Sequence, residues 1–285
     1  MRVAVLGTGT MGAGIARSLL RVGIQVSVWN RHVEKARALA GDGARVESSS
    51  AEAVRDADVV LTMLFDEPAV REVAEQFLPA MGPTAIWMQS ATVGPDGIRR
   101  LADLASDYDV DLVDAPVVGT KKPAEEGTLA VVVSGDPAMI ERLGPVLEAI
   151  GSKTVVAGAA IGAASALKLA CNAWIATITA GTAQSLALCA ALGVDPALFL
   201  STIDGSPSNT PYAQLKGGMM IASDFTPSFG VDGLVKDLEL MLAAIEGGSM
   251  PATLLETLRD EFRAAADEGH DRDDIASVIT AFRAG

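Results

Sequence analysis

The stretch MRVAVLGTGTMGAGIARSLLRVG, residues 1–23, decides the fold of this 285-residue chain. It begins with a short apolar run, VAVLG at 3–7, whose β-branched residues are typical of a buried strand. A glycine-rich turn follows, and the segment 12–23 then has the 3.6-residue apolar spacing of a helix. A strand, a tight turn and a helix in this order predict the first unit of a mostly parallel sheet with helices on both faces.

The same alternation continues to about Gly158. Seven further β-rich runs occur, and segments between them, such as 68–82, have helical spacing. We therefore expect an α/β fold in which a doubly wound, mostly parallel sheet occupies residues 1–160. The seven runs are QVSVW (25–29), ARVES (44–48), DVVLTML (58–64), AIWMQS (85–90), VDLVDAP (110–116), LAVVVSG (129–135) and KTVVAG (153–158).

After Gly158 the strand signals stop, and the rest of the chain has helical patterns. The first helix ends at Gly193, a residue typical of C-terminal caps, and the next begins behind Asp195 and Pro196. We expect an all-helical second domain over residues 161–285, joined to the first domain by its long first helix. The predicted helices span 162–192, a stretch that starts at 196, about 230–246 and about 251–268.

A formal charge of −14 limits the classes of partner. A surface of this sign repels nucleic-acid phosphates and anionic lipids, so we expect neither nucleic-acid nor membrane binding. The first strand begins at once, and its apolar core is too short for a secretory signal, which predicts a cytoplasmic protein. Because no cluster of His, Cys or carboxylate residues has metal-ligand spacing, we expect no metal.

Residues 169–194 carry no charge. The segment is long enough for a membrane span, but Asn172, Gln184, four hydroxyl residues and many alanines favour a buried helix of a soluble protein. A helix that is uncharged on every side must be buried all round, by its own domain and by a second subunit, so we expect a homo-oligomer, a dimer or tetramer. Cys171 and Cys189 lie about 27 Å apart along it, too far for a disulfide, and are expected to be reduced core residues.

The glycine-rich turn lies between a predicted strand and a predicted helix. In that context GTGTMG predicts a dinucleotide site. Gly7 allows the tight turn, Gly9 lets the backbone approach a pyrophosphate, and Gly12 permits close helix packing. The candidate cofactor residues here are Gly7, Thr8, Gly9, Thr10, Met11 and Gly12.

The second strand ends in WNRHVEK, residues 29–35. An enzyme that prefers NAD usually has Asp or Glu here to hold the ribose 2′-hydroxyl, whereas this chain has Asn30 and then Arg31, with Lys35 one turn later. A neutral residue removes the repulsion of a 2′-phosphate, and a guanidinium binds that phosphate. The sequence therefore predicts NADPH as the cofactor.

Lys168 is the only charged residue between Lys153 and Asp195. Burial in an apolar helix costs an ammonium several kcal/mol and lowers its pKa toward the range of a general acid and base. Asn172, four residues later, projects from the same side of the helix and can hold a substrate oxygen beside the amine. The residues alone leave open a second interpretation, in which the lysine stem packs on apolar surface and its head reaches solvent.

Several motifs occur in an order that resembles the β-hydroxyacid dehydrogenase family. They are GTGTMG (7–12), WNRHVEK (29–35), ATVGP (91–95), DAPVVGTKKPAEEGTLA (114–130), GAASALKLACN (162–172) and FGVDGLVKDLEL (229–240). The resemblance covers nearly the whole chain and implies a Rossmann domain followed by an all-helical domain. Within the family, GTKKPAEEG is most similar to the glyoxylate/succinic semialdehyde reductase branch. The resemblance implies an NADP(H)-dependent reductase of small aldehyde or keto acids.

The same resemblance implies roles for single residues. Arg31 would bind the 2′-phosphate, and His32 stands where the family often has Thr. Lys168 matches the catalytic lysine, and Asn172 matches its substrate-orienting partner. The other matched positions are Thr92, which would line the cofactor and substrate cleft, Phe229, which would line the substrate pocket, and the pair Lys236 and Asp237, which would lie by the cofactor and the substrate.

One segment departs from the family pattern. After DAP the family normally has Ser-Gly, which supplies a hydroxyl and backbone N–H groups to a substrate carboxylate; this chain has Val118, Gly119 and Thr120. The Val118 side chain cannot donate a hydrogen bond, whereas the other two residues keep their N–H groups. One alternative is therefore an imine reductase or a reductase of a bulkier, less acidic carbonyl, although imine-reducing relatives typically lack Lys168. Another is a non-catalytic NADPH-binding module.

Overall fold

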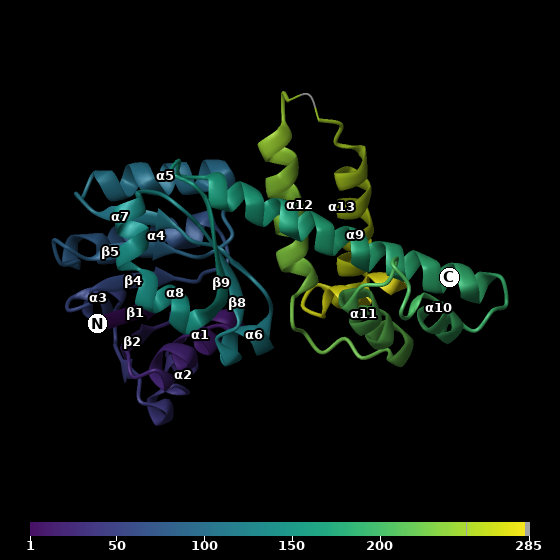
Figure 1. The fold of residues 1–285 in the computed structure, drawn as a ribbon, viewed down its shortest axis with the longest axis horizontal. Helices are drawn as coiled ribbons and strands as arrows, with labels where there is room; N and C mark the ends of the chain where they lie inside the picture. Colours follow the sequence, from purple (N-terminus) through teal and green to yellow (C-terminus); the bar gives the residue numbers. More distant parts are fainter. Residues whose placement is uncertain (249, 283–285) are drawn as a thin grey trace. The chain divides into compact units, whose positions relative to one another are not determined.

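The computed structural model describes residues 1–248 and 250–282, and its contacts divide the chain into two compact units, Met1–Lys168 and Leu169–Gly285. The division falls inside one helix, α9 (Ala163–Ala191), and not in a loop (Figure 1). The boundary expected at residue 160 lies just before that helix. Helix α9 therefore begins in the first unit and continues through the second.

The first unit is built on a nine-stranded sheet with the order β3-β2-β1-β4-β5-β6-β8-β7, in which β9 also pairs with β8. Strands β1 to β6 pair in parallel, β8 is antiparallel to β6 and β7, and β9 is parallel to β8. The mostly parallel sheet is confirmed, whereas β7 is not predicted because two residues show no period. The strands are β1 (Arg2–Leu6), β2 (Gln25–Trp29), β3 (Arg45–Val46), β4 (Val59–Thr62), β5 (Ile86–Gln89), β6 (Asp111–Asp114), β7 (Val117–Val118), β8 (Leu129–Ser134) and β9 (Gly151–Gly158).

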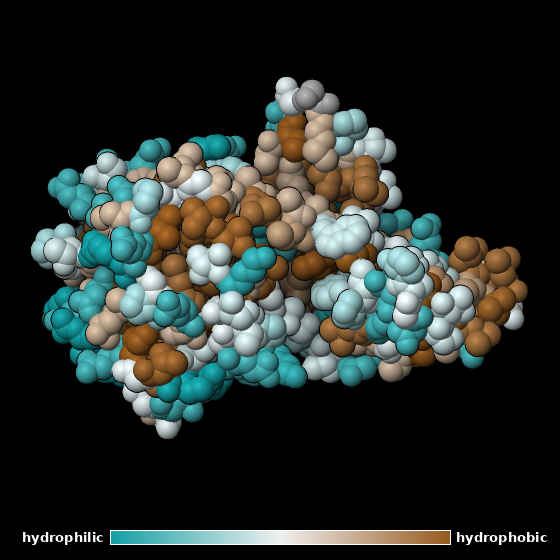
Figure 2. All heavy atoms as spheres, in the orientation of Figure 1, coloured by the Kyte–Doolittle hydropathy of each residue, from teal (hydrophilic) through white to brown (hydrophobic). Residues whose placement is uncertain are grey.

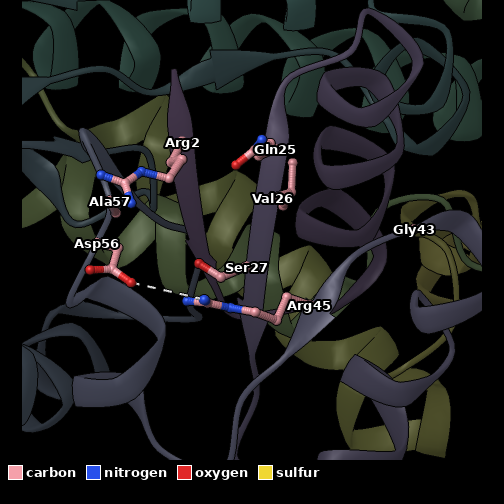
Figure 3. Close-up of a pocket in the computed structure, with 8 residues that line it drawn as sticks. All are labelled: Arg2, Gln25, Val26, Ser27, Gly43, Arg45, Asp56 and Ala57. Carbon is pink, nitrogen blue, oxygen red and sulfur yellow. Dashed lines mark ion pairs between the residues drawn. The ribbon is translucent and has the colours of Figure 1, made fainter.

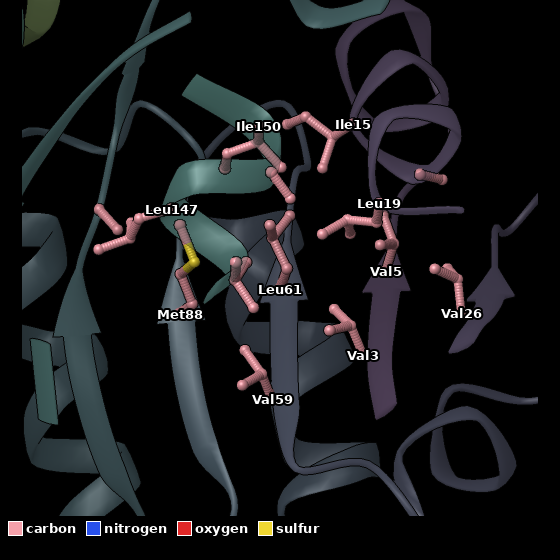
Figure 4. Close-up of a cluster of buried hydrophobic side chains, with 14 of the residues drawn as sticks. Val3, Val5, Ile15, Leu19, Val26, Val59, Leu61, Met88, Leu147 and Ile150 are labelled. Carbon is pink, nitrogen blue, oxygen red and sulfur yellow. The ribbon is translucent and has the colours of Figure 1, made fainter. Parts of the chain in front are cut away.

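Side chains of the central strands alternate between two buried cores, one on each face of the sheet. Val3 and Val5 of β1 belong to the core shown in Figure 4, which Ile15 and Leu19 of the first helix cover. Leu6 of the same strand belongs to the other core. Apolar residues on both faces are what a doubly wound sheet requires. The helices and helical turns of this unit are α1 (Thr10–Arg21), α2 (Val33–Arg37), η1 (Ala40–Asp42), α3 (Ser50–Val54), α4 (Glu67–Phe77), η2 (Leu78–Ala80), α5 (Gly94–Ser106), α6 (Lys121–Glu126), α7 (Pro137–Arg142) and α8 (Gly144–Ile150).

The described part of the second unit is helical, and the four predicted helices are confirmed to within a few residues. Asp195 caps α10 by accepting a hydrogen bond from Ala197 N at 2.9 Å, and Gly193, with φ of +72°, lies just after α9 as expected. Helix α11 is not predicted, because Gly217 and Gly218 interrupt its helical pattern. After α9 follow α10 (Pro196–Ile203), α11 (Pro211–Ala222), α12 (Val231–Ile245), α13 (Thr253–Ala265), η3 (Ala266–His270) and η4 (Ile275–Phe282).

Helix α9 is only partly buried within the single chain. It is the one helix of the described residues that is long and apolar enough to cross a membrane, and 33% of its most apolar window is buried. Trp174 of α9 is exposed, because the residues that the chain itself buries follow one face of the helix. Burial of the other side by a second subunit stays a prediction. Figure 2 shows apolar residues gathered at the end of the second unit, over α9 and α10. Cys171 and Cys189 are free, as predicted, but half-buried.

Candidate active site

Glycine shapes the turn between β1 and α1. Gly7 has φ of +97°, and a side chain there would collide with the carbonyl oxygen of Met63. A Cβ on Gly12 would collide with the carbonyl oxygen of Gly7, so α1 starts in close contact with the turn. A Cβ on Gly9, in contrast, meets nothing within 4 Å in the described part of the chain. A ligand can therefore approach the backbone at Gly9.

The groups around this turn fit the phosphates of a dinucleotide. Gly9 is the N-cap of α1 and has no side chain with which to cap it, so the first N–H groups of the helix are available to an anion. Thr10 and Met11 form the first positions of this helix. Thr8 Oγ1 is buried and has no hydrogen-bond partner among residues 1–248 and 250–282, which marks a polar group that a ligand would satisfy.

Asn30, predicted to contact the cofactor, braces the turn. Its Oδ1 accepts a hydrogen bond from Thr8 N at 3.0 Å, and its Nδ2 donates to the carbonyl oxygen of His32 at 3.0 Å. The amide thus ties the end of β2 to the glycine turn. A carboxylate could not donate the second of these bonds, so an amide is favoured at this position for a structural reason.

A pocket lies where β2 ends and α4 begins. Arg31, His32 and Lys35, all predicted cofactor residues, line it. The guanidinium of Arg31 forms an ion pair with Glu72 of α4, with 2.6 Å between Nη2 and Oε2. The structure thus brings the three candidates together and adds an acidic residue that the sequence does not predict. The other lining residues are Trp29, Asn30, Leu64, Phe65, Ala69 and Val73.

A second pocket lies at the amino ends of β1, β2 and β3, whereas the first pocket lies at the carboxyl end of β2 (Figure 3). Arg2, Gln25 and Arg45, the first residues of β1, β2 and β3, line it, and Arg45 pairs with Asp56 at 4.0 Å. Ligands of open parallel sheets bind at the carboxyl ends of the strands. This pocket, at the amino ends, is therefore not a candidate active site.

The segment matched to the family's carboxylate site lies at the edge of the sheet. Val118 belongs to β7, and Gly119 follows with φ of +142°, where a side chain would come within 2.7 Å of Leu129 Cδ2. Thr120 is the N-cap of α6, but its side chain makes no capping hydrogen bond. Thr92, the remaining candidate of the first unit, lies half-buried between β5 and α5.

Asp114, at the end of β6, anchors the start of α9. Its carboxylate accepts hydrogen bonds from Gly162 N (3.1 Å), from Ser165 N (2.9 Å) and from Ser165 Oγ (2.8 Å). A further bond comes from Ser134 Oγ at 3.1 Å. Burial raises the pKa of Asp114 above its usual value, although these hydrogen bonds act in the opposite direction. Asp114 thus caps α9 and holds its first turn in place, about one turn before Lys168.

Lys168 and Asn172 are both buried, with 8% and 1% of their surfaces exposed. They stand four residues apart on α9 and project from the same side of the helix. Burial of the lysine, which the apolar sequence around it predicts, is thus observed. Its part in catalysis remains a prediction.

Asp237 of α12 lies between two other candidates. Its Oδ2 accepts a hydrogen bond from Asn172 Nδ2 at 2.6 Å, and its Oδ1 accepts one from Lys236 Nζ at 2.7 Å. Asp237 and Asn172 are nearly inaccessible to solvent. The structure therefore joins three of the predicted residues in one polar cluster, in which Asp237 holds the Asn172 amide.

A second lysine, whose burial the sequence analysis does not predict, lies inside the second unit. Lys216 of α11 and Asp274 are both 0% exposed, and Lys216 Nζ lies 2.6 Å from Asp274 Oδ1. Burial acts to raise the pKa of Asp274, but the hydrogen bond from Lys216 and bonds from the backbone outweigh it, and the pKa is lowered. Asp274 Oδ2 also accepts hydrogen bonds from Ser228 N and Oγ and from Phe229 N, so the pair fixes the loop that carries Phe229.

Comparison with known proteins finds two family models that together cover almost the whole chain. Residues 2–158 match the family model described as the NAD binding domain of 6-phosphogluconate dehydrogenase, and residues 162–282 match the one described as NAD-binding of NADP-dependent 3-hydroxyisobutyrate dehydrogenase. The chain is 28% identical to the chloroplastic glyoxylate/succinic semialdehyde reductase 2 of Arabidopsis thaliana, over 99% of this chain and 79% of that protein.

Two further relatives align with this chain over almost their full lengths. A probable 3-hydroxyisobutyrate dehydrogenase of Mycobacterium tuberculosis is 32% identical, over 99% of this chain and 98% of that protein. The crystal structure of 3-hydroxyisobutyrate dehydrogenase from Salmonella typhimurium has a TM-score of 0.91 at 26% identity, and covers 98% of this chain and 99% of that one. The similarity therefore extends through both units.

Proposed function

The chain belongs to the β-hydroxyacid dehydrogenase family, and from that premise we propose that it is an NADPH-dependent reductase of small aldehyde or keto acids of the glyoxylate and succinic semialdehyde class. It is an oxidoreductase that acts on CH–OH or C=O groups with a nicotinamide cofactor. The observation that carries the finer proposal is Lys168, a buried amine one helical turn before the buried amide of Asn172.

The proposed mechanism assigns proton transfer to Lys168. When bound, the coenzyme supplies the hydride that reduces the carbonyl carbon. Negative charge develops on the carbonyl oxygen, and the ammonium of Lys168 stabilises this charge and donates a proton. In the reverse direction the neutral amine removes the hydroxyl proton. Asn172 orients the same oxygen, and Asp237 holds the Asn172 amide through a 2.6 Å hydrogen bond.

The NADPH assignment is supported by the end of β2. Asn30 is neutral, and its amide bonds to the backbone on both sides, so no acid stands at the position that binds a ribose 2′-hydroxyl. Arg31 and Lys35 line the adjacent pocket and carry the positive charge that a 2′-phosphate requires.

The substrate class is supported by the segment after β7. Gly119 and Thr120 supply backbone N–H groups for a carboxylate, and the Thr120 hydroxyl does not cap α6. Val118 favours a second candidate function on the same fold, the reduction of an imine or of a bulkier, less acidic carbonyl. The two candidates differ in the charge of the substrate, which makes them separable by kinetics.

A homo-oligomer is supported by the exposed apolar surface of the second unit. Trp174 of α9 and Leu192, which directly follows the helix, are exposed. A groove at the end of the helix is lined by Leu186, Ala190 and Met220 among others. Exposed apolar residues gathered on one unit are typical of an interface between subunits. A second copy of the chain is the proposed partner.

A substrate screen that follows NADPH absorbance tests the proposed function. We expect turnover of glyoxylate or succinic semialdehyde, with kcat/KM higher for NADPH than for NADH. Lys168→Ala should lower kcat at least about a hundredfold, the scale of a lost general acid, and leave NADPH binding nearly intact. The control is Lys153→Ala, which removes an exposed lysine of β9 and should leave kcat unchanged.

Each part of the proposal has its own contrary outcome. A near-normal kcat in Lys168→Ala would refute the catalytic role of the lysine. Faster turnover of a cyclic imine than of succinic semialdehyde would favour the second candidate. Tight NADPH binding without turnover of any carbonyl compound would indicate a non-catalytic module, and a clear preference for NADH would overturn the cofactor assignment.

A further inference from the structure

An acidic residue stands at the rim of the pocket that contains Arg31. Glu72 lies on α4, and its neighbour Val73 lines that pocket together with Arg31. The Arg31 and Glu72 side chains are 60% and 61% exposed, and they form an ion pair across 41 positions of the chain. The pair joins the end of β2 to the face of α4 beside the pocket.

The ion pair engages a group that a phosphate would need. Arg31 Nη2 lies 2.6 Å from Glu72 Oε2, and Nη2 is one of the terminal nitrogens with which a planar guanidinium binds phosphate oxygens. A phosphate monoester and a carboxylate are both anions at neutral pH. The two would compete for one guanidinium and would repel each other.

A cofactor that lacks the 2′-phosphate meets no such competition, because its ribose 2′-hydroxyl is neutral. We propose that Glu72 is a specificity-determining residue that weakens the preference for NADPH over NADH, through an ion pair with Arg31 that the 2′-phosphate must displace. This inference rests on the proposed cofactor site. It concerns the binding of the 2′-phosphate and not the transfer of hydride.

The exposure of the pair sets the size of the effect. Both side chains are more than half exposed, so water and salt screen the interaction between them and with a bound phosphate. We expect Glu72→Gln, which removes the charge and keeps the shape, to lower the NADPH dissociation constant about three- to tenfold. The dissociation constant of NADH should stay within about twofold of the wild-type value.

The experiment is a calorimetric titration of the full chain, without substrate. NADPH, NADH and adenosine 2′,5′-bisphosphate are the probes, and each is titrated at low and at high salt concentration. The matched control is Glu75→Gln, which removes the same charge from an exposed position three residues further along α4. Binding is measured directly, so the result does not depend on which carbonyl compound the enzyme reduces.

Tighter binding of NADPH and of the bisphosphate in Glu72→Gln alone, with the gain reduced at high salt, would support the inference. An unchanged NADPH dissociation constant, an equal gain for NADH or an equal gain in Glu75→Gln would overturn it. Weaker NADPH binding would also overturn it, because Glu72 would then help to present Arg31 to the phosphate.

If the wild type binds NADH more tightly than NADPH, the cofactor assignment fails. The ratio of the dissociation constants of variant and wild type still measures the effect of Glu72.

Discussion

Both carboxylate oxygens of Asp237 are engaged by neighbouring candidate residues. One accepts a hydrogen bond from Asn172 and the other accepts one from Lys236. A buried carboxylate held in this way fixes the direction in which the Asn172 amide faces. We therefore expect Asp237 to act on the reaction through Asn172, as a positioning residue, although its place in the family motif suggests a contact with substrate.

Asp237→Asn tests this positioning role. The new amide presents an NH₂ group to one of two donors, so one of the two hydrogen bonds is lost and Asn172 is no longer held in one orientation. We expect kcat to fall about tenfold to a hundredfold, because a small misplacement of a positioning group is costly in rate. The measurement is steady-state kinetics, with thermal unfolding to establish that the variant is folded.

Glu239→Gln is the control for Asp237→Asn. It removes a carboxylate from an exposed position of the same helix, where Glu239 pairs with Arg263. Its kcat should equal that of the wild type. A fully active Asp237→Asn variant would show that the orientation of Asn172 does not depend on this carboxylate.

Residues of the candidate site differ in how far the sequence predicts them. Gly7 and Gly9 belong to a motif of neighbouring residues between a strand and a helix, so a local pattern predicts the turn they form. The contact of Arg31 with Glu72 spans 41 positions, and that of Lys216 with Asp274 spans 58. No local pattern reports a contact over such separations, and these pairs become evident only in the structure.

Helix α9 is the element on which the proposed chemistry depends. Its existence follows from a long apolar stretch closed by Gly193, and the sequence predicts both ends to within a residue or two. Its anchor does not follow from the sequence, because Asp114 lies 51 positions before Ser165, the residue to which it bonds. The cap sets the rotation of the first turn and so the direction in which Lys168 projects.

The anchor of α9 predicts a pH dependence of stability. Burial raises the pKa of Asp114 above its usual 3.8, so the folded chain binds this proton more tightly than the unfolded chain does. The resulting contribution to the free energy of unfolding is complete below the unfolded pKa and is lost as pH rises through the folded pKa. As pH rises above 3.8 and through the folded pKa of Asp114, the wild type should therefore lose stability relative to Asp114→Asn.

Urea unfolding of both proteins at several pH values measures this difference. Asp111→Asn, at the exposed start of the same strand, serves as the control and should follow the pH dependence of the wild type. Parallel stability curves for the wild type and Asp114→Asn would contradict the prediction.

At the scale of the whole molecule, the chain combines a net charge of −14 with an apolar region on its second unit. Copies of like charge repel each other, so an uncharged surface is where two copies can meet. Contact between two such apolar surfaces would supply the favourable free energy of association. The exposed apolar residues of this region are Leu188, Leu192, Val194, Leu198, Leu215 and Ile221.

Leu192→Glu tests whether this region joins subunits. Leu192 is 72% exposed in the single chain, so the substitution costs little within one chain but places a charge in the proposed interface. We expect sedimentation velocity to show a wild-type dimer or tetramer and a shift of the variant toward the monomer. Val22→Glu, at an exposed apolar position of the first unit, should leave the assembly intact. A monomeric wild type would contradict the prediction.

The buried pair of Lys216 and Asp274 limits the substitutions that the chain can accumulate in evolution. Loss of either partner alone strands a charge away from water and costs about 3–5 kcal/mol. That is a large share of the roughly 5–15 kcal/mol by which a typical domain is stable. A single substitution at either position is therefore a step toward unfolding, and a joint replacement by apolar residues would still deprive the N–H groups of Ser228 and Phe229 of their acceptor. The lysine and the aspartate should be inherited together, and a lineage that has lost one of them should have lost the other.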